Sequence, residues 1–285
     1  MSATSPDTRI QPPAGDRRSR SRADTMPVER LYPGGSALDV LERDRLITTV
    51  HGRLRGGGTP LVVASSNLDQ LTWFASGGPI DDPALSRDGS DWIVAPDGMP
   101  IVWWAQRQAG HPVEQLAGSD LLPEMLESAV RDATPVAFLG GWPEQHHSLS
   151  ATLAERFPGL EIAGFWGPDR EQLDDGPLQR QLAEEIAATG AGMLVVSLGK
   201  PRQELWLAEH LAATGCHVGL AFGASTDFLG GTVTRAPGLL RRSGLEWLYR
   251  LLREPRRLWR RYLLQGPVAV WRLLVRSPSV DEQRR

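Results

Sequence analysis

Short apolar runs alternate with helical segments through the middle of this chain, and the alternation constrains its fold more than any other feature. Buried parallel strands appear as continuous apolar runs, and helical crossovers join them. The pattern predicts an α/β fold with a mostly parallel sheet and helices on both faces. The predicted strands are Leu61–Ala64, Trp92–Ala95, Val136–Leu139, Leu160–Ala163, Met193–Leu198 and Val218–Phe222. The predicted helices between them are 99–109, 120–132, 144–156, 177–189 and 202–214. Buried helix segments are the alternative, but runs of four to six residues favour strands.

The flanking regions differ in composition and set the expected domain boundaries. The first 30 residues are rich in Ser, Pro, Arg, Asp and Thr and have few aliphatic side chains, so they cannot bury enough apolar surface to order themselves. A helix-like pattern over 38–50 opens the α/β region. Beyond residue 235 no strand pattern remains, and two or three helices are expected, interrupted at Pro255 and at Gly266. We therefore expect a disordered tail at 1–30, an α/β domain at 31–234, a basic helical appendage at 235–276 and a tail at 277–285.

Composition excludes several classes of protein. With 41% hydrophobic and 23% charged residues, the chain has ordinary globular composition. A single cysteine, Cys216, excludes a disulfide scaffold and a Cys-based zinc site, and it fits a reducing, cytoplasmic compartment. The six His residues show no metal-ligand spacing. No apolar run reaches about 18 residues, so we expect no membrane-spanning helix, and the first thirty residues lack the apolar core of a signal peptide.

The basic residues are concentrated at the C-terminal end. Residues 235–276 carry eleven Arg and two Glu, a charge of +9, although the whole chain has a net charge of −3. Such an asymmetry predicts an anionic partner. On one uninterrupted helix Arg250, Arg253, Arg257 and Arg260 would form a stripe, and with the neighbouring Leu and Trp side chains this is typical of a helix on anionic lipid. The alternatives are a helix packed on the body with solvated arginines, self-association through the same apolar surface into a homo-oligomer, and nucleic acid, which the acidic body would repel.

Polar residues follow five of the predicted strands. Ligands of open α/β sheets bind beyond the carboxyl ends of the strands, so five such loops predict a site at one rim. The candidates are Ser65, Asn67, Asp97, Gly140, Gly141, Lys200, Gln203 and Asp227. Asp97 either caps the following helix or acts as a general base, and spacing alone favours the cap. Lys200 either holds a phosphate or is solvated, and Asp227 either bonds a ribose hydroxyl or caps a loop.

Two common nucleotide-binding motifs are absent. The chain has neither G-x-G-x-x-G nor G-x-x-x-x-G-K-[ST], which argues against a dinucleotide-dependent oxidoreductase and a P-loop. Gly140-Gly141 precedes a predicted helix, and backbone N–H groups at a helix start suit an anionic group. This signal is weak alone, because Gly-Gly is usually a turn.

An ordered set of motifs resembles a known family. Its members are Asn67, Pro96–Pro100, Gly118–Leu121, Phe138–Gly141, Phe157–Leu160, Gly199–Glu204, Asp227–Gly231, Arg235–Pro237, Gly244–Leu252 and Glu254–Arg257. Together they resemble the WecG/TagA/CpsF glycosyltransferases, glycosyltransferase family 26, over residues 60–263. The resemblance implies a Rossmann-like enzyme at the inner face of the cell membrane. Such enzymes move a sugar from a UDP-sugar to a polyprenyl-diphosphate-linked sugar, with inversion and without a metal or other cofactor.

The resemblance also assigns roles to single residues. Asp97 matches the family's base, Asn67 a substrate-positioning residue, Gln203 a site glutamine and Asp227 a nucleotide-contacting acid. The basic residues of the family's C-terminal appendage, which closes over the active site, match Arg250, Arg257 and Arg260.

Three positions depart from the family pattern. Ser65 replaces Thr and Arg202 replaces Lys, so a hydroxyl and a charge are kept. Gln115 replaces an Arg, and this loss favours one rival interpretation, a non-catalytic protein that binds polyprenyl-diphosphate lipids or a membrane partner.

Overall fold

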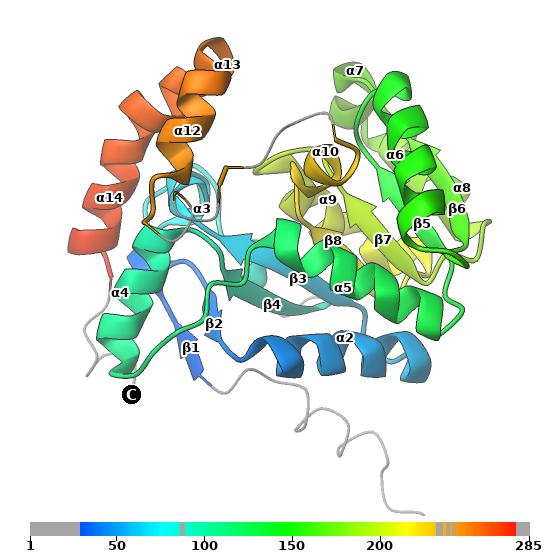
Figure 1. Cartoon of the computed structure of the whole chain (residues 1–285), viewed down its shortest axis with the longest axis horizontal. Coiled ribbons are helices and arrows are strands. Elements are labelled where there is room, and N and C mark those ends of the chain that lie inside the picture. Colours follow the sequence, from blue (N-terminus) through cyan, green and yellow to red (C-terminus); the bar gives the residue numbers. More distant parts are fainter. Residues whose placement is uncertain (1–28, 86–88, 232–235, 238–239, 241–242, 278–285) are drawn as a thin grey trace, which may run out of the picture.

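A six-stranded parallel sheet forms the centre of the computed structural model, which describes residues 29–85, 89–231, 236–237, 240 and 243–277 (Figure 1). Its strand order is β4-β3-β8-β7-β5-β6, with every neighbouring pair parallel. The strands are β3 (Leu61–Ser66), β4 (Asp91–Pro96), β5 (Val136–Leu139), β6 (Ile162–Trp166), β7 (Met193–Val196) and β8 (Val218–Ala221). The predicted α/β fold is confirmed.

Helices cover both faces of this sheet because successive strand residues point to opposite sides. Leu61 and Val63 of β3 pack in one buried cluster, and Val62 and Ala64 pack in another. The first cluster includes side chains of α2 (Arg43–Gly56), α5 (Gly118–Arg131) and α6 (Pro143–Arg156). The second includes side chains of α8 (Gly176–Ala187), α9 (Arg202–His210) and the 3-10 helix η3 (Leu211–Thr214). Burial on both faces explains why the strands appear as continuous apolar runs.

A third cluster forms beyond the β4 edge, where the two ends of the described chain meet. The antiparallel pair β1 (Glu29–Leu31) and β2 (Leu38–Val40) packs there with α3 (Leu68–Phe74), α4 (Met99–Ala109) and α14 (Gly266–Val275). In Figure 1 the red α14 lies on the left of the sheet, and it packs beside α3. The remaining elements are η1 (Pro33–Gly35), η2 (Pro83–Leu85), α7 (Arg170–Asp174), α10 (Ser225–Leu229), α12 (Glu246–Arg253), α13 (Pro255–Trp259) and η4 (Arg260–Gln265).

The prediction of a helix over 38–50 is wrong for its first residues. Leu38–Val40 is strand β2, and the helix begins at Arg43. Asp39 is fully buried and accepts hydrogen bonds from the Arg30 guanidinium (2.6 and 2.9 Å) and from the Val94 N–H (2.8 Å). These bonds hold the segment extended against the sheet. Since Glu29 and Arg30 already belong to β1, they are not part of a tail; residues 1–28 lie outside the described residues.

Strand β6 begins two residues later than predicted. Leu160 belongs to a turn closed by its N–H bond to the Phe157 carbonyl (3.0 Å), although its side chain packs against the core. The apolar pattern therefore extends past the strand into the turn. Leu198 and Phe222 likewise follow β7 and β8 rather than ending them.

The C-terminal segment is helical and is interrupted at Pro255, as predicted. The interruption expected at Gly266 is wrong, because Gln265 and Gly266 keep helical backbone angles between η4 and α14. Glu254 leaves helical geometry (φ −129°, ψ 57°), and Pro255 begins α13. Arg250 and Arg253 therefore lie on α12, and Arg260 begins η4, so the arginines do not form one stripe on a single helix axis. The expected boundary at residue 234 and the tail beyond Ser277 lie outside the described residues.

We expect Cys216 to be unreactive in the folded protein. Its side chain is buried, and desolvation raises the pKa of the thiol to about 11, so almost none of the nucleophilic thiolate exists at pH 8. Native protein should show no reaction with a thiol reagent at pH 8, and denatured protein should show one equivalent. Rapid reaction of the native protein would contradict the burial.

Candidate functional site

Five loops converge at the carboxyl ends of neighbouring strands. The strand order places the loop after β4 at one end, followed by those after β3, β8, β7 and β5. Because all these strands are parallel, the candidate residues predicted from the sequence lie along one edge of the sheet. Four strand spacings of about 4.8 Å separate β4 from β5, so this rim is roughly 19 Å long.

Asp97 is held at the β4 end of the rim by Asn67. The Asn67 side-chain oxygen accepts hydrogen bonds from the N–H groups of Asp69 (3.1 Å) and Gln70 (3.2 Å), and thereby caps α3. Its amide nitrogen is then directed at the Asp97 carboxylate and donates to Oδ2 (3.2 Å). A Cβ on Gly98 would lie 3.0 Å from the Asn67 Cβ, so glycine permits this close approach.

Two further observations concern the position of Asp97. The N-cap position of α4 is Gly98, so Asp97 does not occupy the cap position that spacing favoured. The Gln115 amide donates to the Asp97 backbone carbonyl. Gln115, which stands where the family commonly has Arg, therefore supports the loop that carries Asp97.

Lys200 is the centre of a buried polar cluster. Its ammonium group donates to the Ser65 carbonyl (2.9 Å), to the Gln70 side-chain oxygen (2.8 Å) and to Glu204 Oε1 (2.5 Å). The side chains of Lys200 and Glu204 are only 6% and 1% exposed. An ammonium group has three donors, and all three are used within the protein, so Lys200 is not solvated. It ties the end of β3 to α3 and α9.

Glu204 and Gln203 complete this cluster. Burial raises the pKa of the Glu204 carboxyl, whereas the charge of Lys200 and the hydrogen bonds from Lys200 and Gln203 act in the opposite direction. The Gln203 amide nitrogen donates to the Ala221 carbonyl (2.9 Å) and to Glu204 Oε1 (3.1 Å). Gln203 is 2% exposed. In this conformation it orients Glu204 and the end of β8.

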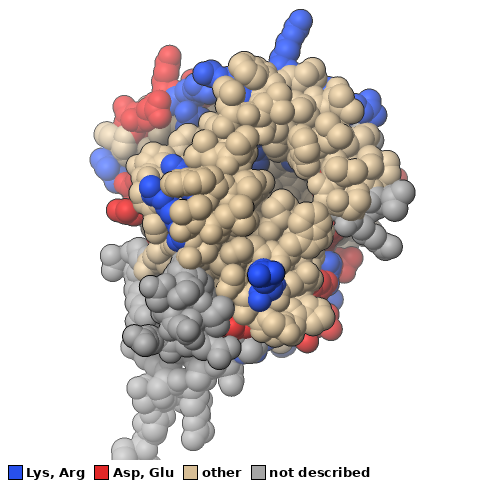
Figure 2. Space-filling view, turned by 90° about the vertical axis from the view of Figure 1, so that its left-hand side faces the viewer, with Lys and Arg blue, Asp and Glu red and all other residues tan. Residues whose placement is uncertain are grey.

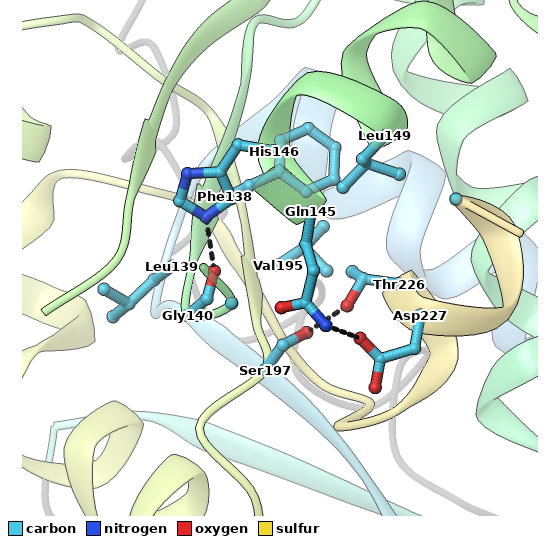
Figure 3. Close-up of a pocket in the computed structure, with 12 residues that line it drawn as sticks. Phe138, Leu139, Gly140, Gln145, His146, Leu149, Val195, Ser197, Thr226 and Asp227 are labelled. Atoms are coloured by element: carbon cyan, nitrogen blue, oxygen red, sulfur yellow. Dashed lines mark hydrogen bonds between the residues drawn. The ribbon is translucent and has the colours of Figure 1, made fainter. Parts of the chain in front are cut away.

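A small pocket opens between the ends of β5, β7 and β8 (Figure 3). It lies where the chain leaves neighbouring strands in opposite directions, because α6 leads outward from β5 to β6 and α9 leads from β7 towards β8. Ligands of open α/β sheets bind at such switch points. The lining includes Gly140, Gly141, Gln145, His146, Ser197, Thr226 and Asp227.

Backbone and side-chain contacts shape this pocket. Gly140 has φ +105°, and a Cβ there would lie 2.6 Å from the Ser197 carbonyl oxygen, so only glycine fits. The Gln145 amide donates to Asp227 Oδ1 (3.2 Å), and the hydroxyls of Ser197 and Thr226 lie 2.8 Å apart. The sequence predicted Gly140, Gly141 and Asp227 here.

The sequence interpretation missed three polar lining residues and gave His146 no role. Gln145, Ser197 and Thr226 carry no motif of their own. The one available signal is the placement of Gln145 in the first turn of the helix after Gly140-Gly141.

The C-terminal helices bring one predicted arginine into contact with α10. The Arg250 guanidinium lies 5.4 Å from the ring centroid of Phe228, which follows Asp227 on α10. Arg260 is exposed, and its guanidinium lies over Trp259 at 5.9 Å. The side chain of Arg257 lies outside the described residues.

The part of the chain that the structure describes has neither a metal-ligand cluster nor a membrane-spanning helix. It holds no group of three or more His, Cys, Asp or Glu side chains placed to bind a metal ion. None of the helices seen there combines the length and the hydropathy needed to cross a bilayer.

Comparison with known proteins identifies the family. The sequence profile described as "Glycosyl transferase WecG/TagA/CpsF family" matches residues 32–282. The N-acetylglucosaminyldiphosphoundecaprenol N-acetyl-beta-D-mannosaminyltransferase of Bacillus spizizenii (strain W23) is 38% identical over 180 residues. The aligned region covers 60% of this chain and 64% of that relative, so the chain spans somewhat less than two thirds of the relative's length. The chain therefore belongs to the WecG/TagA/CpsF family of glycosyl transferases.

Proposed function

We propose that this protein is an inverting glycosyltransferase of cell-surface polysaccharide biosynthesis. It moves a hexose from a UDP-sugar to a sugar carried on a polyprenyl diphosphate. The observation that carries the proposal is the Asp97 carboxylate, held by Asn67 at the same rim as the pocket between β5, β7 and β8. Family membership and the activity named for the B. spizizenii relative support N-acetylmannosamine as the donor sugar and a lipid-linked N-acetylglucosamine as the acceptor.

The donor lies along the rim in this proposal. The uridine diphosphate portion occupies the pocket, with Asp227 and Gln145 beside the nucleoside and the Gly140-Gly141 backbone beside the diphosphate. A nucleotide sugar is elongated, and the rim leads from this pocket past β8 and β3 towards Asp97. The transferred sugar therefore faces the carboxylate.

Transfer needs one base and a cationic environment for the leaving group. Asp97 accepts the proton of the acceptor hydroxyl while that oxygen forms a bond to the anomeric carbon on the side opposite the diphosphate. The bond from that carbon to the diphosphate oxygen breaks, the configuration inverts, and UDP leaves with the electron pair. Arg250, Arg257 and Arg260 stabilise its growing charge, since guanidinium groups bind phosphates in a bidentate manner. Arg250 already lies beside α10.

An assay of purified protein tests this proposal. UDP release and the lipid product should be measured with a panel of UDP-sugars and a short-chain lipid-linked acceptor. The proposal predicts UDP release and a lipid-linked disaccharide that both depend on the acceptor. Lipid binding without UDP release for any donor would instead support a non-catalytic lipid-binding protein.

The C-terminal helices also carry the proposed membrane surface, at the inner face of the cell membrane. Large apolar side chains are exposed along α12, α13, η4 and α14, and they include Trp247, Leu252, Trp259, Trp271 and Leu274. Figure 2 faces the side that carries α14 and shows a broad tan area with Lys and Arg groups around it. Exposed apolar side chains beside arginines suit anionic lipid.

Replacing two of these side chains should weaken membrane binding. Leu252 and Leu274 are 74% and 73% exposed, so Leu252→Ser/Leu274→Ser should leave the fold intact. The lost apolar burial should lower binding to anionic vesicles at least about tenfold in a sedimentation assay. A matched control, Leu178→Ser/Leu205→Ser, changes exposed leucines of α8 and α9 and should bind normally. Equal binding by both variants would contradict the proposed surface.

A further inference from the structure

Helix α3 stands between the C-terminal helices and the Asn67–Asp97 pair. It has seven residues and directly follows Asn67. A helix this short has little stability of its own in water, so its direction depends on its partners. Lys200 holds its middle through Gln70 (2.8 Å). The partners at its two ends come from the C-terminal helices.

The first turn of α3 is held by an ion pair with η4. Arg261 Nη2 lies 3.0 Å from Asp69 Oδ2. The side chains are 34% exposed for Arg261 and 11% exposed for Asp69. The acid also lies at a helix start, where negative charge is favoured. This contact therefore fixes the N-terminal end of α3 to the C-terminal helices.

The last turn of α3 is held by α14. Arg272 Nη1 donates to the carbonyl oxygens of Leu71 (2.8 Å) and Thr72 (2.6 Å), which have no partner within so short a helix. Leu71 packs in the same buried cluster as Leu273 of α14. The C-terminal helices thus contact α3 at both ends.

The first turn of α3 in turn orients Asn67. The backbone N–H of Asp69, the residue whose carboxylate forms the ion pair, donates to the Asn67 side-chain oxygen (3.1 Å). This bond leaves the amide nitrogen of Asn67 directed at Asp97. A tilt of α3 would therefore move the donor that holds the Asp97 carboxylate.

We propose that the Asp69–Arg261 ion pair is the contact through which the docked C-terminal helices align α3, and through it the Asn67–Asp97 pair. Asp69 and Arg261 are positioning residues for the transfer step, so the inference rests on the proposed function. Arg250 of the same group of helices lies over Phe228, the residue after the pocket-lining Asp227. Docking of the C-terminal helices therefore aligns the base and supplies a cation to the leaving group at the same time.

A double-mutant cycle tests this role by kinetics. Asp69→Asn and Arg261→Gln should each lower kcat about tenfold, since a small misplacement of a reacting group slows transfer strongly. The donor KM should change less than about twofold, and the melting temperature should stay the same. The double variant should be no slower than either single variant, because both remove one contact. Arg261→Lys should restore most of the rate.

A matched control removes a different arginine. Arg253→Gln takes the same charge from the C-terminal helices, but the Arg253 guanidinium contacts Tyr249 of its own helix, so kcat should remain near that of the unaltered protein. Additive losses in the cycle, or equal losses for Arg253→Gln and Arg261→Gln, would overturn the inference.

Amide hydrogen exchange separates this inference from the proposed function. The Asp69 and Gln70 amides should exchange faster in Arg261→Gln than in Arg253→Gln, because they bond to Asn67. Equal exchange in the two variants would overturn the inference whether or not the protein transfers sugar. Failure of the unaltered protein to release UDP would overturn the proposed function alone.

Discussion

Asp97→Asn should lower kcat about 1,000-fold while leaving the affinity for the UDP-sugar nearly unchanged. General bases typically contribute between about 10²- and 10⁴-fold to a rate. The amide keeps the shape of the side chain but cannot accept the proton from the acceptor hydroxyl. The donor pocket lies between β5, β7 and β8, whereas Asp97 follows β4. Steady-state kinetics and a UDP-sugar titration should therefore separate catalysis from binding.

A matched aspartate controls for this substitution. Asp169 caps α7 through its bond from the Gln172 N–H, and asparagine caps helices equally well. Asp169→Asn should therefore retain full activity. A kcat for Asp97→Asn within about threefold of that control would exclude the base role.

Lys200→Met should destabilise the protein by about 3–5 kcal/mol, because it leaves the Glu204 carboxylate buried without its cation. Glu204 is 1% exposed, and Lys200 is the only cation bonded to it among the described residues. For a chain of this size the loss lowers Tm by roughly 10 °C. Thermal unfolding followed by circular dichroism measures this change.

The loss of stability in Lys200→Met should depend on pH in a defined direction. Burial raises the pKa of Glu204 above its ordinary value of 4.5. The folded state then binds the proton more tightly than the unfolded state, so stability is greatest below the ordinary pKa and falls as the pH rises through the folded pKa. The Tm deficit of Lys200→Met should therefore shrink between pH 8 and pH 5.

A second variant removes the buried charge altogether. Lys200→Met/Glu204→Gln should recover at least half of the lost stability at pH 8, because no unpaired carboxylate remains. If the double variant is less stable than Lys200→Met, the buried carboxylate is not the cause of the loss.

The central strands could be predicted because burial on both faces marks them. Val136–Leu139 is β5 with the bounds expected from its apolar run, and the helix over 99–109 is α4. The β1–β2 pair could not be predicted, because each strand has three residues and is held by contacts with distant parts of the chain, such as the bond from the Val94 N–H to Asp39. Contacts of this kind leave no periodic pattern.

The site was predictable in its location but less so in its contacts. The rim follows from the order of strands and loops, and Asp97 and Asn67 meet there. Whether the side chains of Lys200 and Gln203 point inward depends on which hydrogen-bond acceptors the fold places near them. Here the acceptors are the Ser65 carbonyl for Lys200 and the Ala221 carbonyl for Gln203. Position after a strand end does not say whether a side chain faces the ligand or the core. The ion pair between Arg261 and Asp69 likewise joins residues that are far apart in the sequence.

A structure of the protein with UDP bound would show whether one rim holds both the donor and the base. We expect the uridine between β5, β7 and β8 beside Gln145 and Asp227, with the diphosphate near Arg250 and directed along the rim towards Asp97. A nucleotide bound elsewhere, or a diphosphate directed away from Asp97, would contradict the proposal that one rim holds both the donor and the base.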